Sequence, residues 1–457
     1  MTERLREKLG EQVDAASLVA FRVIFGLAAI VAAVRFWQMG WIDTYLVDPP
    51  NHLHYAGFEW VRPLSSTGMH LVFAGLVVAA ACIALGLFYR LAVLAYFLLF
   101  TYAELIDQAL YLNHYYAVSL IAFAMLFLPL AETGSLDALR RGVRGIGTAP
   151  KWALYLVRTE LGLVYFFAGV AKLKADWLLH AEPLRTWLLA RTDFPVLGPF
   201  FQYAFVAFAM CWAGTLFDLT VPFFLSIRRT RPFAYAAVVG FHAITGLLFN
   251  IGLFPLLMIV YTLVFFEPDW PRRALARVGL VLRQAAPTTS TLGPRMPRAG
   301  FAAASVFVLL QVAIPLRHYA MPGDVLWTYE GFNFAWHVMI AEKGAQVDLL
   351  AVDRETGAVT LVPPCDHYTR LQVHVLAENP ELIVQFAHVV ADDFRRRGHD
   401  VAIYARSYAS LNGRPMQELV AGDVDLTTIH AWTPASRYVR PLGYQAPAPR
   451  PFLAVAH

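Results

Sequence analysis

Long uninterrupted apolar stretches constrain this chain more than any other feature. A helix of about twenty apolar residues spans the hydrocarbon core of a bilayer, and 58% of the 457 residues are hydrophobic, more than a soluble core of this size can bury. We therefore predict a membrane protein whose residues 1–318 form an all-α bundle of about nine transmembrane helices. The nine windows lie at 16–37, 69–88, 91–108, 112–131, 152–173, 198–227, 232–249, 251–267 and 301–316.

Basic residues are unevenly divided between the connections that join these windows. The positive-inside rule places the more basic set in the cytoplasm. The first run is longer than a signal-peptide core and has no cleavage pattern, so we expect a retained first helix. Nine crossings from a cytoplasmic N-terminus place the C-terminal domain outside. The basic set holds Arg4, Arg6, Lys8, Arg90, Arg140, Arg141, Arg144, Lys151, Arg228, Arg229, Arg231 and the arginines from Arg272 to Arg298, and the other set holds only Arg62, Lys174, Arg185 and Arg191.

Residues 319–457 differ in composition and predict an extracytoplasmic α+β domain. The alternating segments Gln346–Val352 and Ala358–Val362, joined by a Gly-containing turn, are typical of a β-hairpin. Glu378–Arg397 has apolar residues at helical spacing and ends at Gly398.

Composition also excludes some classes of function. The net charge of +4 is small, and the basic residues form no continuous stripe, so we expect no nucleic-acid partner. Cys82, Cys211 and Cys365 lie in unrelated segments without metal-ligand spacing, which predicts neither a disulfide framework nor a metal site.

Several polar residues lie in the apolar windows, where each needs a partner or a function. Arg158 and Glu160 lie two residues apart, on different helix faces, so we expect each to pair with a neighbouring helix. Asp218 either caps a backbone break near Pro222 or pairs with Arg158. His242 either forms a hydrogen bond between helices or belongs to a functional site.

Lys172 is the most informative of these residues because it directly follows the uncharged, largely apolar run of residues 161–171. Loss of solvation favours its neutral amine, which is a base. The alternative is that Lys172 reaches the outer interface, as we expect for Lys174. His114 begins the fourth window at the same outer level, so two polar anomalies converge on one leaflet.

Seven segments carry a family resemblance in register with these windows. Together they resemble the vitamin K-dependent γ-glutamyl carboxylase family, in the compact form of bacterial members with an HTTM domain, over about residues 15–440. The segments are LNHYYAVS (112–119), VYFFAGVAKLKADW (164–177), LFDLTVPFF (216–224), FHAITGLLFNIGLFP (241–255), FEPDWPRR (266–273), GFNFAWHVM (331–339) and SLNGRPMQELVAGDVDL (410–426).

The resemblance implies an integral membrane enzyme of the bacterial inner membrane. Such an enzyme oxygenates a vitamin K or menaquinone hydroquinone with dioxygen to its epoxide. This reaction is coupled in animal members to carboxylation of peptide glutamate with CO2. The implied partners are the lipid bilayer, the reduced quinone and a glutamate-containing peptide or protein, without a metal. The oxygenated cofactor supplies the strong base for the glutamate step, while the protein orients it and excludes water.

The resemblance also assigns roles to individual residues. Lys172 is implied as the weak base, and Asn113 and His114 as its active-site neighbours. His242, Met339, Phe249 and Trp336 are implied around the quinone, and Arg317, His318 and Lys343 around the glutamate substrate.

Two segments depart from the family pattern. The adjacent lysine pair of the family is reduced to Ala171-Lys172, and the His/Arg-rich stretch that follows Met339 in animal enzymes is IAEKGAQ here. The sequence therefore supports hydroquinone epoxidation more strongly than glutamate carboxylation. The alternative hypothesis is a non-catalytic quinone-binding, lipid-handling or transport protein that keeps the same scaffold.

Overall fold

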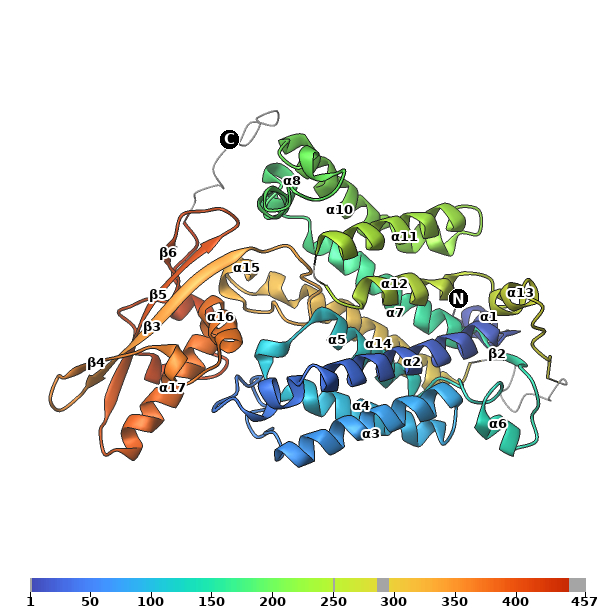
Figure 1. The fold of residues 1–457 in the computed structure, drawn as a ribbon, viewed down its shortest axis with the longest axis horizontal. Helices are drawn as coiled ribbons and strands as arrows, with labels where there is room; N and C mark the ends of the chain where they lie inside the picture. The colour runs from blue at the N-terminus through green and yellow to red at the C-terminus, as the bar shows by residue number, and fades with distance from the viewer. Residues whose placement is uncertain (1, 250, 286–295, 444–457) are drawn as a thin grey trace.

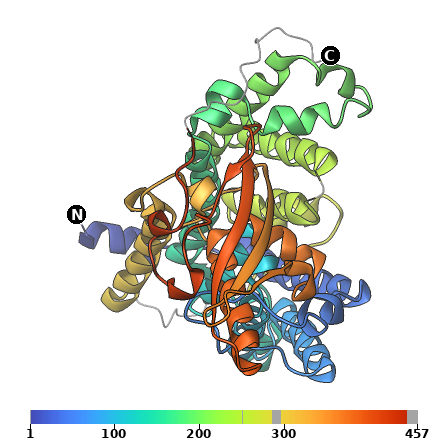
Figure 2. The same ribbon diagram turned by 90° about the vertical axis from the view of Figure 1, so that its left-hand side faces the viewer.

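The computed structural model describes residues 2–249, 251–285 and 296–443. A bundle of helices forms the larger part, and an α+β domain packs against one end of it (Figure 1). Figure 2 shows the sheet of this domain in front of the bundle when the molecule is viewed from that end.

A helix occupies each of the nine apolar windows. Five of the helices, α2, α3, α7, α10 and α14, are long and apolar enough to cross a membrane by length and composition. The protein is therefore a multi-pass membrane protein, and the count of nine spans stays a prediction. The helices are α2 (Ala16–Gln38), α3 (Ser66–Leu85), α4 (Tyr89–Leu105), α5 (Asn113–Met125), α7 (Lys151–Ala171), α10 (Ala204–Ser226), α11 (Arg231–Leu248), α12 (Phe254–Tyr261) and α14 (Arg298–Leu316).

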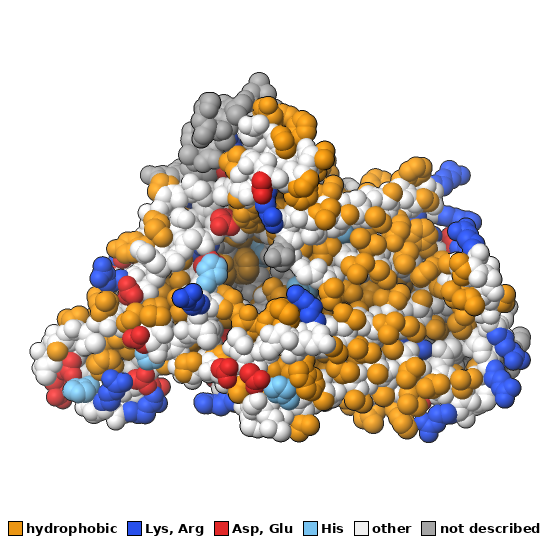
Figure 3. All heavy atoms as spheres, in the orientation of Figure 1, with side chains coloured by type: hydrophobic (Ala, Val, Ile, Leu, Met, Phe, Trp, Pro, Cys, Tyr) orange, Lys and Arg blue, Asp and Glu red, His pale blue; other side chains and the backbone are white. Residues whose placement is uncertain are grey.

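Small residues allow the bundle helices to approach one another. A Cβ added to Gly26 of α2 would lie 2.6 Å from the carbonyl oxygen of Ala80 in α3, so only glycine permits this contact. Helix α3 begins with a capping hydrogen bond from Gly68 N to Ser65 Oγ and ends at Gly86, whose φ of 64° suits glycine. Apolar side chains cover much of the bundle surface (Figure 3).

The basic connections meet at the end of the bundle far from the α+β domain. Strand β1 (Gln12–Asp14) pairs with β2 (Thr148–Pro150) in antiparallel register. Arg272 of α13 (Trp270–Ala276) binds the Asp14 carboxylate at 2.7 Å and the Ile146 carbonyl at 2.6 Å. Helices α1 (Thr2–Gly10) and α6 (Leu136–Arg140) lie at the same end (Figure 1). This grouping agrees with the prediction that the basic connections lie on one side of the membrane. Part of the basic linker, residues 286–295, lies outside the described residues.

The C-terminal domain is built on a four-stranded sheet with the order β4-β3-β5-β6. The predicted hairpin is confirmed, because β3 (Lys343–Asp353) pairs antiparallel with β4 (Val359–Val362). The predicted helix is also present, as α17 (Pro380–Arg396), and begins two residues later because Asn379 caps it and Pro380 takes its first position. Strands β5 (Val401–Leu411) and β6 (Gln417–Glu418) and helix α16 (Arg370–Glu378) complete the domain.

The connections with few basic residues, at the opposite end of the bundle, contact the C-terminal domain. Gln372 of α16 donates at 2.6 Å to Asp107, which lies between α4 and α5. Asn51 donates to the carbonyl oxygen of His367. Arg414 forms two hydrogen bonds, of 2.6 and 2.7 Å, with Asp176 of α8 (Ala175–His180). Three connections at this end therefore fix the domain over the bundle.

Candidate active site

Lys172 lies at the C-terminal end of α7, where its side chain turns inward. A Cβ added to Gly169 would lie 2.8 Å from the Leu219 backbone nitrogen, so this glycine allows α10 to approach α7 closely. The Lys172 amine donates to Asp218 Oδ2 at 2.8 Å and to the Ala168 carbonyl at 3.2 Å. The two side chains are almost fully buried, because Lys172 is 6% and Asp218 3% exposed.

This pair corrects two expectations. Lys172 does not extend to the outer interface, although Lys174 does pair with Asp324 at 3.3 Å in a half-exposed position. Asp218 neither caps a backbone break nor pairs with Arg158, because α10 continues through Pro222 and presents Asp218 to Lys172. Lys172 is thus not an isolated amine, since it has a carboxylate partner.

Arg158 and Glu160 behave differently from each other. Arg158 donates to the carbonyl oxygens of Val264 and Phe266 at 2.9 and 2.8 Å, which confirms a contact with a neighbouring segment. Glu160 is 3% exposed, and its Oε1 has no hydrogen-bond partner among the described residues. The expectation of an interhelical pair is therefore wrong for this oxygen.

A second polar contact lies two helical turns before Lys172. Tyr165 Oη and His242 Nε2 are 2.8 Å apart, joining α7 to α11. The Phe254 ring of α12 contacts two imidazoles, with its centroid 6.1 Å from that of His242 and 5.5 Å from that of His114. His242 is thus joined to α7, the helix that ends at Lys172, and both imidazoles contact Phe254.

Asn113 links the bundle to the segment that follows α14. Its side-chain nitrogen donates to the His337 carbonyl at 3.2 Å, and its oxygen accepts from the Tyr111 hydroxyl at 3.1 Å. Burial lowers the pKa of His337 to about 3, so its ring is neutral. His337 Nε2 has no hydrogen-bond partner among the described residues.

The 331–340 segment holds bulky residues in the left-handed backbone region. Phe334, Trp336 and Met339 have φ values of 64°, 59° and 51°. Each such residue costs on the order of 1–3 kcal/mol and persists only where its surroundings enforce it. Trp336 is buried, and its ring centroid lies 5.1 Å from that of Tyr116 in α5. Met339 is half-buried in the same segment.

The remaining predicted residues flank this segment. The Arg317 guanidinium binds the Asn333 carbonyl at 2.5 Å, and the His318 ring centroid lies 4.9 Å from that of His337. Phe249 contacts Trp187 of α9 (Leu184–Leu189), with ring centroids 5.8 Å apart, and Trp187 donates to Glu342 at 2.5 Å.

Lys343 differs from these residues because its amine is enclosed within the C-terminal domain. It donates to the carbonyl oxygens of Trp327 in α15 (Val325–Thr328) and Glu378, at 2.7 and 2.5 Å. Burial lowers the pKa of Lys343 to about 7. A substrate reaches this amine only if these hydrogen bonds break.

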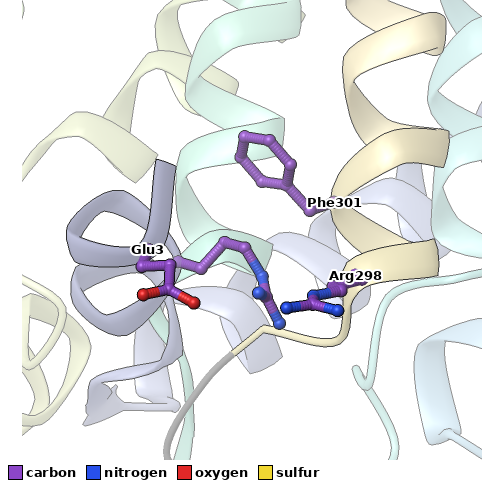
Figure 4. Close-up of a pocket in the computed structure, with 4 residues that line it drawn as sticks. Glu3, Arg298 and Phe301 are labelled. Carbon is purple, nitrogen blue, oxygen red and sulfur yellow. The ribbon is translucent and has the colours of Figure 1, made fainter. Parts of the chain in front are cut away.

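Figure 3 shows a hollow on the molecular surface where the C-terminal domain meets the bundle. Figure 4 shows a second one, a cavity of about 480 Å³ at the opposite end, lined by Glu3, Arg6, Arg298 and Phe301. None of the predicted site residues lines this second cavity, so it is separate from the candidate active site.

Two family models match the chain and together cover most of it. The HTTM domain model matches residues 11–270. The model of the vitamin K-dependent gamma-carboxylase lumenal domain matches residues 297–444. The chain belongs to the vitamin K-dependent γ-carboxylase family. No solved structure matches it.

The two family regions of this carboxylase-like protein meet at the candidate site. Lys172, Asn113, His114 and His242 lie in the HTTM region, and Met339 lies in the lumenal-domain region. The lumenal-domain model begins before α14, whereas the sequence suggested a boundary at 318/319. That boundary stays a prediction.

Three features of the site escaped the sequence analysis. They are the pairing of Asp218 with Lys172, the identity of Tyr165 as the partner in the helix-to-helix hydrogen bond that was one alternative for His242, and the contact of Asn113 with the buried His337. Tyr165 is seven residues before Lys172, a spacing that places two side chains near the same helix face. That spacing was therefore a usable signal, whereas the other two contacts depend on tertiary packing.

Proposed function

We propose that this protein oxygenates a membrane hydroquinone of the vitamin K or menaquinone type to its epoxide, with Lys172 as the base, and carboxylates a peptide glutamate with CO2. The observation that carries the proposal is the buried Lys172–Asp218 pair at the end of α7, the helix whose Tyr165 contacts His242. When bound, the reduced quinone supplies, with dioxygen, the oxidising power and the strong base that side chains lack.

The residues fit a hydroquinone in chemical character. A phenolic hydroxyl titrates near pH ~10, as tyrosine does, so an amine is a suitable proton acceptor. Aromatic rings beside the polar groups suit a flat, apolar ring. Phe254 contacts both His114 and His242, and we assign His242, Met339, Phe249 and Trp336 to the walls of the quinone site.

Asn113 and His114 complete the proposed site on the side of the C-terminal domain. The Asn113 amide is held by Tyr111 and the His337 carbonyl, and an imidazole near the ring can move protons or stabilise negative charge on oxygen. Arg317 and His318, beside His337, are the proposed contacts for a substrate carboxylate.

The proposed topology follows from the two ends of the bundle. Nine spans with a cytoplasmic N-terminus place the C-terminal domain outside the bacterial inner membrane, over residues 319–457. The clustering of the basic connections at the end opposite this domain supports that arrangement.

The decisive experiment uses purified protein, reduced quinone and air, with mass analysis of the quinone product. Wild-type protein should form epoxide, and Lys172→Ala should lose it because the proton acceptor is removed while the apolar walls remain. Small primary amines or raised pH should partly restore turnover. Lys174→Ala is the matched control, since this neighbouring lysine is half-exposed and pairs with Asp324.

The same experiment separates the proposal from its alternative. A quinone-binding or transport protein binds the quinone but consumes no dioxygen and forms no epoxide. If Lys172→Ala forms epoxide at the wild-type rate at neutral pH, Lys172 is not the base.

A further inference from the structure

Two lysines that lie two residues apart in sequence, Lys172 and Lys174, each pair with an aspartate, but the two pairs have different environments. Lys172 and Asp218 are 6% and 3% exposed, and their N–O distance is 2.8 Å. Lys174 and Asp324 are more exposed, with side-chain exposures of 25% and 38% and a distance of 3.3 Å. Only the first pair is sealed between helices, where α7 and α10 pack through Gly169.

The buried environment determines the charge that the first pair can carry. An unpaired charge inside a protein costs several kcal/mol, whereas a hydrogen-bonded pair without net charge avoids most of that cost. The resting pair therefore has no net charge, whether the shared proton is on Lys172 Nζ or on Asp218 Oδ2. In either form it can take up one further proton.

We propose that Asp218 is a positioning residue that acts with Lys172 as a proton relay. Lys172 passes a proton to Asp218 Oδ2 while it accepts one from the hydroxyl of the bound hydroquinone. The O–H bond of the hydroquinone breaks as an N–H bond forms on Lys172, and a second N–H bond breaks as an O–H bond forms on Asp218. The inference rests on the proposed function, because it takes Lys172 as the residue that faces the hydroquinone.

The relay leaves an ammonium group beside the oxygen that has lost its proton. Lys172 then stabilises the negative charge on that oxygen, and the protonated Asp218 no longer competes for the ammonium. The position of Asp218 behind Lys172 allows this transfer without moving either helix, because the 2.8 Å hydrogen bond is already formed.

Other titratable groups surround the pair and must be considered in any pH experiment. Tyr165 of α7 interacts electrostatically with Asp218 and joins His242 of α11. Cys211 of α10 interacts with Lys172 and with Glu182, which precedes α9.

A spectroscopic experiment tests the relay without turnover. Infrared difference spectra are recorded under argon when a short-chain menaquinol is added to the purified full chain. Wild-type protein should gain a protonated-carboxyl band that Asp218→Asn lacks. Asp324→Asn should keep the band, since it removes the carboxylate of the exposed pair but retains the oxygen that caps α15. Absence of the band in wild type, or its persistence in Asp218→Asn, overturns the inference.

The pH profile of epoxide formation gives a second readout. In Asp218→Asn, Lys172 can accept a proton only as the free amine, so the acidic limb should move to higher pH. We also expect the rate at neutral pH to fall at least about tenfold. Asp218→Glu should restore part of both. An unchanged limb with an unchanged rate, or a faster rate, contradicts the relay.

Failure of the inference can be distinguished from failure of the proposed function. If Lys172→Ala is inactive while Asp218→Asn matches wild type, only the relay fails. If wild type forms no epoxide, the proposed function fails. If Asp218→Asn does not fold, Asp218→Glu supplies the test, because its carboxyl band must shift in frequency relative to wild type, and an unshifted band overturns the relay.

Discussion

The ion pair between Arg414 and Asp176 should contribute strongly to stability. Both side chains are largely buried, at 11% and 13% exposure. Two hydrogen bonds of 2.6 and 2.7 Å join them, and Asn412 adds a third to Asp176 at 2.9 Å. Removing one partner of a buried pair leaves an unpaired charge and costs about 3–5 kcal/mol. Because Asn412 still binds Asp176, we expect Arg414→Gln to cost about 3 kcal/mol, the low end of that range.

A matched control is available in the same domain. Arg440 also binds two carboxylates, those of Glu418 and Asp423, but its side chain is 45% exposed. Arg440→Gln should cost about 1 kcal/mol or less. Thermal unfolding of detergent-purified protein, followed by tryptophan fluorescence at one scan rate, compares the two variants. The expected difference in Tm is on the order of 10 °C for a domain of this size.

The double variant and the pH dependence sharpen this prediction. Asp176→Asn combined with Arg414→Gln should be more stable than Arg414→Gln alone, because no charge remains unpaired. Burial alone would raise the pKa of Asp176, but its hydrogen bonds with Arg414 and Asn412 lower it below the usual value. The stabilisation is therefore present above the unfolded pKa of about 4 and is lost as pH falls through the folded value. Equal Tm shifts in Arg414→Gln and Arg440→Gln would refute this account of the domain contact.

Three further predictions follow from individual residues. Cys365 is exposed in the C-terminal domain, so an impermeant thiol reagent should label it in intact spheroplasts and Cys365→Ser should remove the signal; labelling only after permeabilisation would reverse the topology. Burial lowers the pKa of Lys343 to about 7, below the unfolded value of about 10.4. The Tm of wild type should therefore rise with pH between these two values, and Lys343→Met should abolish the rise. Parallel curves of Tm against pH for wild type and Lys343→Met would contradict this prediction. His114→Ala should lower epoxide yield at least about tenfold while quinone binding, measured by fluorescence quenching, stays near wild type; an unchanged yield would exclude a role in the chemistry.

Local sequence signals predicted much of the fold. Apolar length marked the helix windows, and the C-terminal hairpin and α17 followed from alternation, helical spacing and the residues at their ends. The windows could not give helix lengths in the structure. For example, α5 ends at Met125 and α12 at Tyr261, within stretches that stay apolar, because helix ends inside the bundle depend on packing.

The polar partners in the bundle were less predictable. Asp218 lies 46 residues after Lys172, and no local pattern indicates which of several buried cations it meets. Gly169 decides the outcome by allowing α10 to approach, and that contact is visible only in three dimensions. His337 escaped notice for the same reason, since its contact with Asn113 joins segments more than 200 residues apart.

The central claim, oxygenation of a hydroquinone with Lys172 as the base, is tested most directly with isotopic dioxygen. Purified wild-type protein and Lys172→Ala are incubated with reduced menaquinone under ¹⁸O₂ at neutral pH, and the masses of the quinone products are measured by mass spectrometry. The account predicts an epoxide that carries ¹⁸O from wild type and little or none from Lys172→Ala. Binding of the quinone without labelled epoxide, or equal labelled epoxide from both proteins, would contradict it.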